Sequence, residues 1–235
     1  MRIAMLLTDG VFDTGLATML DTFALANAFA GDASCFAITR VGVRKRVKTG
    51  QGLLVPLDPL PRRPPELVLV PALGAKSPAA IDVALASREL RDAGALLGEW
   101  SERGTKIAAA CTATFLLAAA GLLEGKPATT TWWLAPTFRE RFPAVKLDEA
   151  KMIVDAGSVV TAGAALAHLD LALWIVRRSS PAVARTTARH LTFDGRPSQG
   201  AFVMPDHLAH SDALVERFEA WARTHLAGFS IGAAA

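Results

Sequence analysis

Short apolar segments that alternate with helical patterns are the feature that most restricts how this chain can fold. The clearest of these segments are residues 3–7, 67–70 and 106–110, and apolar residues at helical spacing follow over residues 16–29. Strands of this kind are buried on both faces, and their alternation with helices is typical of a parallel sheet covered on both sides. The sequence therefore predicts an α/β fold in which a doubly wound, mostly parallel sheet carries helices on both faces.

Composition and charge exclude several other classes of protein. The chain has 235 residues, of which 51% are hydrophobic and 20% charged, so one large core is expected and disorder is excluded. A formal net charge of +3 does not by itself argue for nucleic-acid binding. The first apolar run is too short for a signal peptide, and no run reaches the roughly 18 apolar residues of a membrane span. We expect a cytoplasmic protein.

The sequence indicates neither a metal site nor an organic cofactor. The two cysteines, Cys35 and Cys111, match no disulfide framework and no metal-binding spacing. His207 and His210 lie three residues apart, but no third ligand is near them. The glycines in segment 50–52 lack the strand–helix context of a dinucleotide-binding fingerprint. We therefore expect no metal, no cofactor and no contact with a membrane.

Capping residues predict several element boundaries. Ser77 followed by Pro78 predicts the start of a long helix, which is expected to break near Gly94 and to resume over residues 96–102. A helix over residues 181–191 and a loop rich in glycine and proline follow further along. The chain is accordingly divided into an α/β domain (1–192), a linker (193–210) and the beginning of a further unit (211–235).

Cys111 stands at the end of an apolar strand pattern and at the start of a helical one. The segment 109–113 reads Ala-Ala-Cys-Thr-Ala, so small residues lie two positions before and two after the cysteine. A nucleophile elbow has this pattern, because the tight strand-to-helix turn admits only small neighbours and presents the nucleophile to a cleft. A helix N-terminus also favours a thiolate. The alternative interpretation is a small buried hydrophobic residue, which is what we expect of Cys35.

The segments around Cys111 resemble a known superfamily. Residues 111–112 (CT), 116–125 (LLAAAGLLEG) and 128–132 (ATTTW) are similar to the class I glutamine amidotransferase-like superfamily, in its PfpI/isonitrile-hydratase branch. Residues 161–173 resemble a later block of that branch, with Asp170 on its aspartate. The similarity runs from residue 2 to about residue 178. It implies a flavodoxin-like fold and a homodimer.

The chain departs from this pattern at the groups that a cysteine hydrolase needs for proton transfer. Thr112 stands where peptidase members carry histidine, and isonitrile-hydratase-like members, which also have threonine there, pair the cysteine with an aspartate. The resemblance places Gly15 at that aspartate, and Asp13 could substitute for it only if the loop follows another route. Residues 71–74 (PALG) replace a Pro-Gly-Gly turn that supplies backbone donors, and Thr131 replaces a histidine.

His168 takes the place of a residue that is usually small in the related block. It could act as a base for Cys111 in a rebuilt Cys–His pair. The alternative is a packed, hydrogen-bonded histidine inside the domain. The residues expected to bind a small ligand are Gly74, Cys111, Thr112 and Gly15.

The C-terminal region resembles AraC-type transcription regulators that carry an amidase-like front domain. Residues 195–202 (GRPSQGAF) are similar to their linker, residues 214–226 to the helix after it, and residues 229–231 (FSI) to the start of their first helix-turn-helix unit. The resemblance implies that the chain stops where the DNA-binding helices begin. DNA would then be a partner only through a helix-turn-helix domain outside this chain.

Three functions follow as hypotheses. The preferred one is the ligand-sensing and dimerising domain of an AraC-type regulator, whose degenerate site binds a small metabolite near Cys111 without converting it. The alternative is a Cys111-dependent hydrolase or hydratase for a small amide, nitrile or isonitrile, with Asp13 or His168 as partner. The third is a dimerisation scaffold without ligand, in which Leu73 or Trp132 would fill the cleft.

Overall fold

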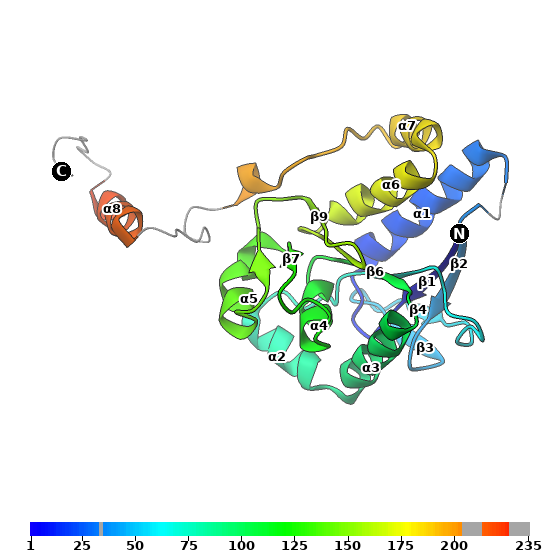
Figure 1. The fold of residues 1–235 in the computed structure, drawn as a ribbon, viewed down its shortest axis with the longest axis horizontal. Helices are drawn as coiled ribbons and strands as arrows, with labels where there is room; N and C mark the ends of the chain where they lie inside the picture. The colour runs from blue at the N-terminus through cyan, green and yellow to red at the C-terminus, as the bar shows by residue number, and fades with distance from the viewer. Residues whose placement is uncertain (33–34, 204–212, 226–235) are drawn as a thin grey trace.

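Strands and helices alternate along the chain in the computed structural model, which describes residues 1–32, 35–203 and 213–225 (Figure 1). The strands are β1 (Arg2–Leu6), β2 (Ala37–Val41), β3 (Arg46–Lys48), β4 (Leu54–Pro56), β5 (Leu67–Val70), β6 (Lys106–Ala110), β7 (Pro127–Ala128), β8 (Lys146–Leu147), β9 (Ile153–Asp155) and β10 (Val159–Ala162). The α-helices are α1 (Asp13–Ala30), α2 (Pro78–Ala86), α3 (Arg88–Glu102), α4 (Ala113–Ala119), α5 (Ala135–Arg141), α6 (Ala167–Ser179), α7 (Pro181–His190) and α8 (Ala213–Thr224). Two short 3-10 helices are η1 (Trp132–Leu134) and η2 (Gly200–Phe202).

Six strands form the central sheet in the order β2-β1-β5-β6-β10-β9. The first five are parallel to their neighbours, and β9 pairs antiparallel with β10 at one edge. The parallel strands, renumbered in chain order, run 2-1-3-4-5, which is the flavodoxin-like arrangement. The predicted doubly wound, mostly parallel sheet is confirmed.

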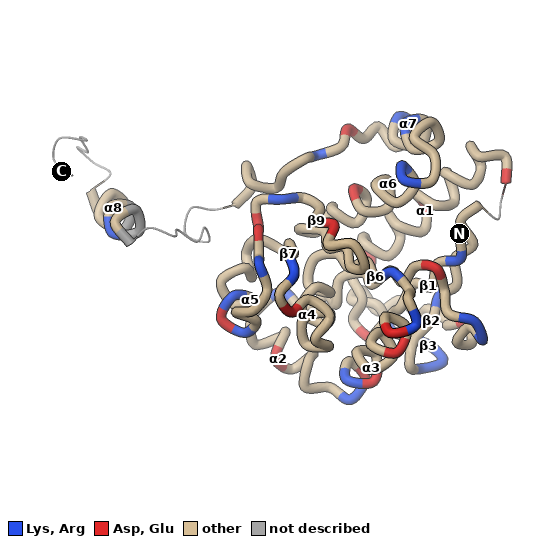
Figure 2. Tube along the Cα trace, viewed as in Figure 1, with Lys and Arg blue, Asp and Glu red and all other residues tan. Residues whose placement is uncertain are grey.

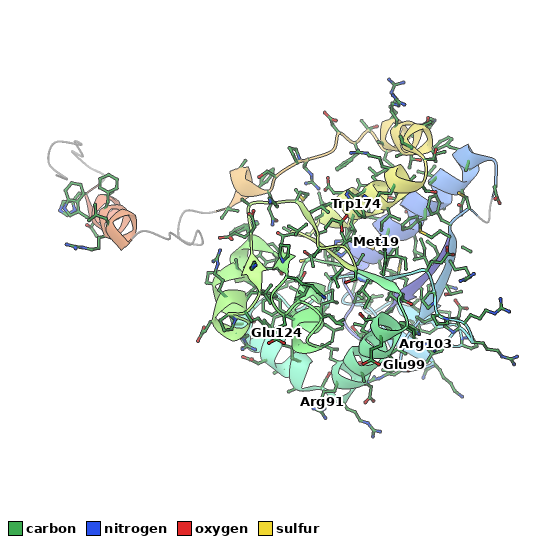
Figure 3. All side chains as sticks on the ribbon, in the orientation of Figure 1. Met19, Arg91, Glu99, Arg103, Glu124 and Trp174 are labelled. Atoms are coloured by element: carbon green, nitrogen blue, oxygen red, sulfur yellow. The ribbon has the colours of Figure 1, made fainter. Side chains whose placement is uncertain are left out.

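The core consists of two layers, one on each face of the sheet. Alternate residues of β1 point to opposite layers: Ile3 and Met5 lie in one, Ala4 and Leu6 in the other. Helices α1, α6 and α7 cover the first face, and α2, α3 and α4 lie on the opposite side (Figure 1). Met19 of α1 is fully buried in the first layer (Figure 3). Apolar burial on both faces explains why residues 3–7, 67–70 and 107–110 are apolar throughout.

The predicted break near Gly94 is wrong, because the long helical segment divides at Ser87 instead. Ser87 has an extended backbone and serves both helices: its N–H donates to the carbonyl of Ala84, and its hydroxyl accepts the N–H of Leu90 at 3.2 Å. Gly94 lies inside α3, where that helix passes close to Ala120. The predicted cap at Ser77 is confirmed, since its hydroxyl accepts the N–H of Ala80.

Charged side chains of both signs are mixed on the surface, as on α3, where Arg lies beside Asp and Glu (Figure 2). Within the described ranges, no helix combines the length and apolar character that a membrane span requires. Among the expected features of the tail, the helix α7 is confirmed. His207 and His210 lie outside the described residues, as do residues 229–231 with their resemblance to a helix-turn-helix unit.

Candidate functional site

Cys111 lies in the two-residue turn between β6 and α4. Its φ is +57°, a left-handed conformation that costs a residue with a side chain about 1–3 kcal/mol. Two hydrogen bonds hold the turn: the Cys111 N–H donates to the carbonyl of Ala162 at 2.9 Å, and the Thr130 hydroxyl donates to the carbonyl of Cys111 at 3.1 Å. The neighbouring strand and loop thereby fix a strained backbone that presents this side chain at the carboxyl end of the sheet.

A cavity of about 250 Å³ opens beside the cysteine. It lies past the carboxyl ends of β5, β6 and β10, where open α/β sheets bind ligands. Its size falls below the roughly 300–1,000 Å³ of most ligand pockets, so it suits a small molecule. The lining residues are Phe12, Ala72, Gly74, Ala75, Lys76, Cys111, Thr112, Trp133 and Ala165.

The thiol of Cys111 is buried and remains protonated at neutral pH. Burial raises the pKa of this thiol to about 11, and hydrogen bonds from the Thr112 backbone and the hydroxyls of Thr131 and Thr112 offset part of the effect. The expected preference for a thiolate at the start of a helix is therefore wrong, because desolvation outweighs the helix terminus. A protonated thiol is a weak nucleophile.

The imidazole of His168 fills the space that a side chain at position 15 would occupy. A Cβ atom at Gly15 would lie 2.5 Å from Nε2 of His168, so no side chain fits at position 15 while the imidazole is there. The imidazole, fully buried, takes the space next to the position where the resemblance expects an acid. The glycine at position 15 and the histidine at position 168, which depart from the family pattern at distant points of the sequence, are therefore structurally linked.

Both ring nitrogens of His168 are engaged in hydrogen bonds. Nε2 accepts the backbone N–H of Ala72 at 3.0 Å, which places the proton on Nδ1, and Nδ1 donates to the carbonyl of Ala165 at 2.5 Å. Burial lowers the pKa of His168 to about 4, so the ring is neutral at physiological pH. In this arrangement neither nitrogen can take a proton from Cys111.

Two backbone donors of the turn that follows β5 are engaged within the protein. The N–H of Ala72 is bound by His168, and the N–H of Leu73 donates to the Thr112 hydroxyl at 3.0 Å. An oxyanion would need unengaged donors at this place. These two N–H groups serve the structure of the domain.

Asp13 binds the hairpin that connects β3 and β4. Its Oδ2 accepts the N–H of Gln51 at 2.9 Å, in the β3–β4 hairpin, and its buried Oδ1 has no partner among the described residues. Neither Asp13 nor Gly15 lines the cavity, whereas Gly74, Cys111 and Thr112 do.

Several residues that line the cavity were not among the site residues predicted from the sequence. Phe12, Lys76 and Ala165 line the cavity, and among the lining residues that the structure describes Lys76 alone carries a formal charge. The available sequence signal is position: Phe12 directly precedes Asp13, Lys76 lies two residues after the 71–74 turn, and Ala165 lies three residues before His168. Trp133 lines the cavity, while Leu73 and Trp132, expected to fill the cleft of a scaffold, do not. Within residues 1–32, 35–203 and 213–225, no group of three His, Cys, Asp or Glu side chains could hold a metal ion.

A flavodoxin-like sheet with a cysteine in a strained strand-to-helix turn defines a class of α/β proteins. In this class the cysteine site lies at the carboxyl ends of the parallel strands. Residues 1–178 match the DJ-1/PfpI family, and the chain belongs to that family.

Two related sequences and one solved structure add to this assignment. The chain is 31% identical over 147 residues to an uncharacterized protein in the cpoL 5' region of Streptomyces lividans, covering 61% of this chain and 96% of that protein. It is 37% identical over 71 residues to the HTH-type transcriptional regulator GlxA of Rhizobium meliloti (strain 1021), covering 30% of this chain and 22% of the regulator. The crystal structure of an AraC family transcriptional regulator from Pseudomonas putida matches with a TM-score of 0.68 at 18% identity, over 81% of this chain and 98% of that one. The fold is therefore shared with regulators.

Proposed function

We propose that this chain is the ligand-sensing and dimerising domain of an AraC-type transcription regulator of the cytoplasm. It binds a small molecule beside Cys111 and does not convert it. The observation that carries the proposal is His168, which fills the place expected for the catalytic acid and binds a backbone donor of the site. Support for a regulator comes from the GlxA and AraC-family relatives.

Three chemical requirements of a cysteine hydrolase are unmet around Cys111. The thiol is protonated, because burial raises its pKa to about 11. The imidazole of His168 is neutral and engaged at both nitrogens. The N–H groups of Ala72 and Leu73 are bound within the protein. A sensor gains from these losses, because it has to hold its effector without destroying it.

The cavity also limits the class of effector. Its walls are almost entirely apolar, and within the described part of the chain Lys76, an exposed residue, is the cation that lines it. We propose a small, mostly apolar molecule whose polar or acidic end lies toward Lys76. Binding would change the relation between the C-terminal segments of the two protomers, which from residue 211 onward resemble the start of a DNA-binding unit.

Thermal unfolding in the presence of small amides, carboxylic acids and isonitriles, together with product analysis, tests this function. We expect at least one compound to raise the Tm of the wild-type chain. The same compound should lose its effect in Ala165→Phe, which fills the cavity, and keep it in Cys35→Ala, a variant remote from the cavity. Product formation that Cys111→Ala abolishes would overturn the proposal.

The alternative function remains a Cys111-dependent hydrolase or hydratase. The strained turn at Cys111 and the open cavity beside it are the observations that favour it. Its proton acceptor would have to be Asp13, whose Oδ1 lacks a partner among the described residues, after a rearrangement of the Asp13–Gln51 contact. It requires fast alkylation of Cys111 at neutral pH. Slow alkylation without turnover would exclude it.

A further inference from the structure

Gln199 is a buried polar residue that lies beyond the part of the chain matching the DJ-1/PfpI family. The match ends at residue 178, and Gln199 is only 1% exposed. A side-chain amide is buried at a cost unless its donors and acceptor are hydrogen-bonded. Gln199 meets this condition by binding two separate loops of the family domain.

The first of these loops connects β10 to α6. The Gln199 Oε1 accepts the N–H of Ala164 at 2.8 Å. The amide lies so close to Gly163 that a Cβ atom there would collide with it. Glycine at position 163 is therefore what admits the amide to this loop.

The second loop is the segment after β7. The Gln199 Nε2 donates to the carbonyl of Thr130 at 2.9 Å and approaches the Thr129 hydroxyl and the carbonyl of Lys151, both at 3.3 Å. One amide group thus bridges two loops that are far apart in the sequence.

Both loops form walls of the Cys111 site. Thr130 binds the carbonyl of Cys111, and the hydroxyl of the next residue, Thr131, lowers the pKa of the thiol. On the other side, Ala162 binds the N–H of Cys111, and Ala165 lines the cavity. Gln199 consequently contacts the loops that hold Cys111 from both sides.

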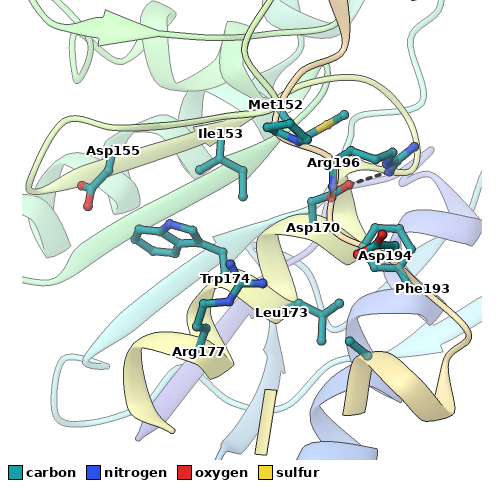
Figure 4. Close-up of a pocket in the computed structure, with 13 residues that line it drawn as sticks. Met152, Ile153, Asp155, Asp170, Leu173, Trp174, Arg177, Phe193, Asp194 and Arg196 are labelled. Carbon is teal, nitrogen blue, oxygen red and sulfur yellow. Dashed lines mark hydrogen bonds and ion pairs between the residues drawn. The ribbon is translucent and has the colours of Figure 1, made fainter. Parts of the chain in front are cut away.

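Gln199 belongs to a segment that runs over the domain surface toward the C-terminus. We call residues 193–203 the strap. Arg196 holds it through an ion pair with Asp170 at 2.5 Å, at a groove of about 590 Å³ between the strap, α6 and β9 (Figure 4). Ser198 holds it at a second point, where its hydroxyl donates to the carbonyl of Ala150 at 2.6 Å.

We propose that Gln199 is a positioning residue of the Cys111 site and couples the cavity to the strap. Displacement of the Thr130 or Ala164 loop by a ligand in the cavity strains the amide bridge, and release of the bridge frees the strap. Linkage requires the reverse effect as well: breaking the Gln199 bridge opens the cavity, whereas loosening the strap at a contact outside this bridge does not. The proposal rests on the proposed ligand-sensing function, for which it supplies the route from the cavity toward the C-terminal segment.

Alkylation of Cys111 by iodoacetamide and hydrogen exchange of the strap measure the two ends of this coupling. The background is Cys35→Ala, so that Cys111 is the only thiol. In Gln199→Ala we expect alkylation to accelerate about tenfold and exchange in residues 193–203 to increase. Gln199→Glu retains the size and the Oε1 acceptor but loses the Nε2 donor, and should change both quantities in the same direction.

Ser198→Ala is the matched control, because it loosens the strap at Ala150 without touching the Thr130 or Ala164 loop. It should raise exchange in the strap and leave alkylation within about twofold of the background protein. The pH dependence of alkylation is a second measurement, and loosening of the strap alone should not change it. Admission of water by Gln199→Ala should lower the apparent pKa of Cys111, whereas Ser198→Ala should not; the neighbouring Lys76 and His168 are unchanged in both.

The reverse effect is tested with the alkylated protein. The adduct on Cys111 occupies the cavity, and exchange in residues 193–203 should then rise in the background protein. Unchanged alkylation in both Gln199 variants, or equal acceleration in Ser198→Ala, would overturn the coupling while leaving ligand binding intact. Failure of every compound to bind, with the alkylation response present, would instead overturn the sensing function alone.

Discussion

At the scale of single residues, the exchange between positions 15 and 168 decides what the site can do. The imidazole needs the space that a glycine leaves, and in return it satisfies the N–H of Ala72 and the carbonyl of Ala165. Buried polar groups without partners cost about 1–3 kcal/mol each. His168 is therefore bound into the fold more firmly than a catalytic base that must exchange protons.

This exchange predicts a non-additive pair of substitutions. Gly15→Ala should destabilise the protein by about 1–3 kcal/mol, because its Cβ would overlap the imidazole. His168→Ala should cost about as much or more, since it leaves a void and an unpaired N–H at Ala72. The double variant should lose less stability than the sum of the two single losses, because without the imidazole the Cβ at position 15 has nothing to overlap. Urea unfolding measures all three free energies, and strict additivity would contradict the shared volume.

The buried imidazole also predicts a pH dependence of stability. Burial lowers the pKa of His168 to about 4 from its ordinary value of 6.5, so the unfolded chain binds more protons between these two values. Stability is then fully present above about pH 6.5 and is lost as the pH falls toward 4, by up to about 3 kcal/mol. His168→Gln should flatten this part of the curve relative to wild type, while carboxylates that titrate in both proteins cancel. Parallel curves for the two proteins over this range would refute the assignment.

The site shows which of its properties the sequence could predict. The position of Cys111 between strand and helix follows from a local pattern, and so do the two departures at Gly15 and His168. Their contact does not, because the two positions lie on α1 and α6 and only the packing of those helices brings them together. Gln199 was visible only as part of a linker pattern. Its burial depends on two loops distant in sequence.

At the scale of elements, local signals succeed where a single residue carries them. Ser77 with Pro78 predicted the start of α2, and apolar segments predicted β1, β5 and β6. The division at Ser87 was missed because Gly94 looked like the stronger breaker. In the structure α3 approaches α4 at Gly94, so a small residue there serves helix packing.

A pair of substitutions in this region tests the revised boundary. Ser87→Ala should lower the free energy of unfolding by about 0.5–2 kcal/mol, because it removes the hydroxyl that caps α3. Gly94→Ala should raise it by about 0.5–1 kcal/mol, since the added Cβ would meet Ala120 at 3.5 Å, an ordinary contact, inside a continuous helix. Gly98→Ala, with open space at its Cβ, is the control on the same helix. Destabilisation by Gly94→Ala alone would indicate a break at that position.

At the scale of the whole molecule, the charge distribution matters more than the net charge. The chain carries 25 Lys and Arg against 22 Asp and Glu, and the two signs are interspersed (Figure 2). DNA binding draws most of its affinity from several cations that contact phosphates together. A surface of mixed sign offers few such groups.

The chain should therefore bind DNA weakly and without sequence preference, even though its relatives include regulators. We expect dissociation constants no tighter than the roughly 10⁻⁴–10⁻⁶ M of non-specific binding at physiological salt. A gel-shift series with promoter and random duplexes measures both affinity and preference, and a protein with a helix-turn-helix domain fused after residue 235 is the positive comparison. Tight, sequence-specific binding by these 235 residues alone would show that the DNA-recognition surface lies within this chain. The same chain would then both bind the small ligand and contact DNA.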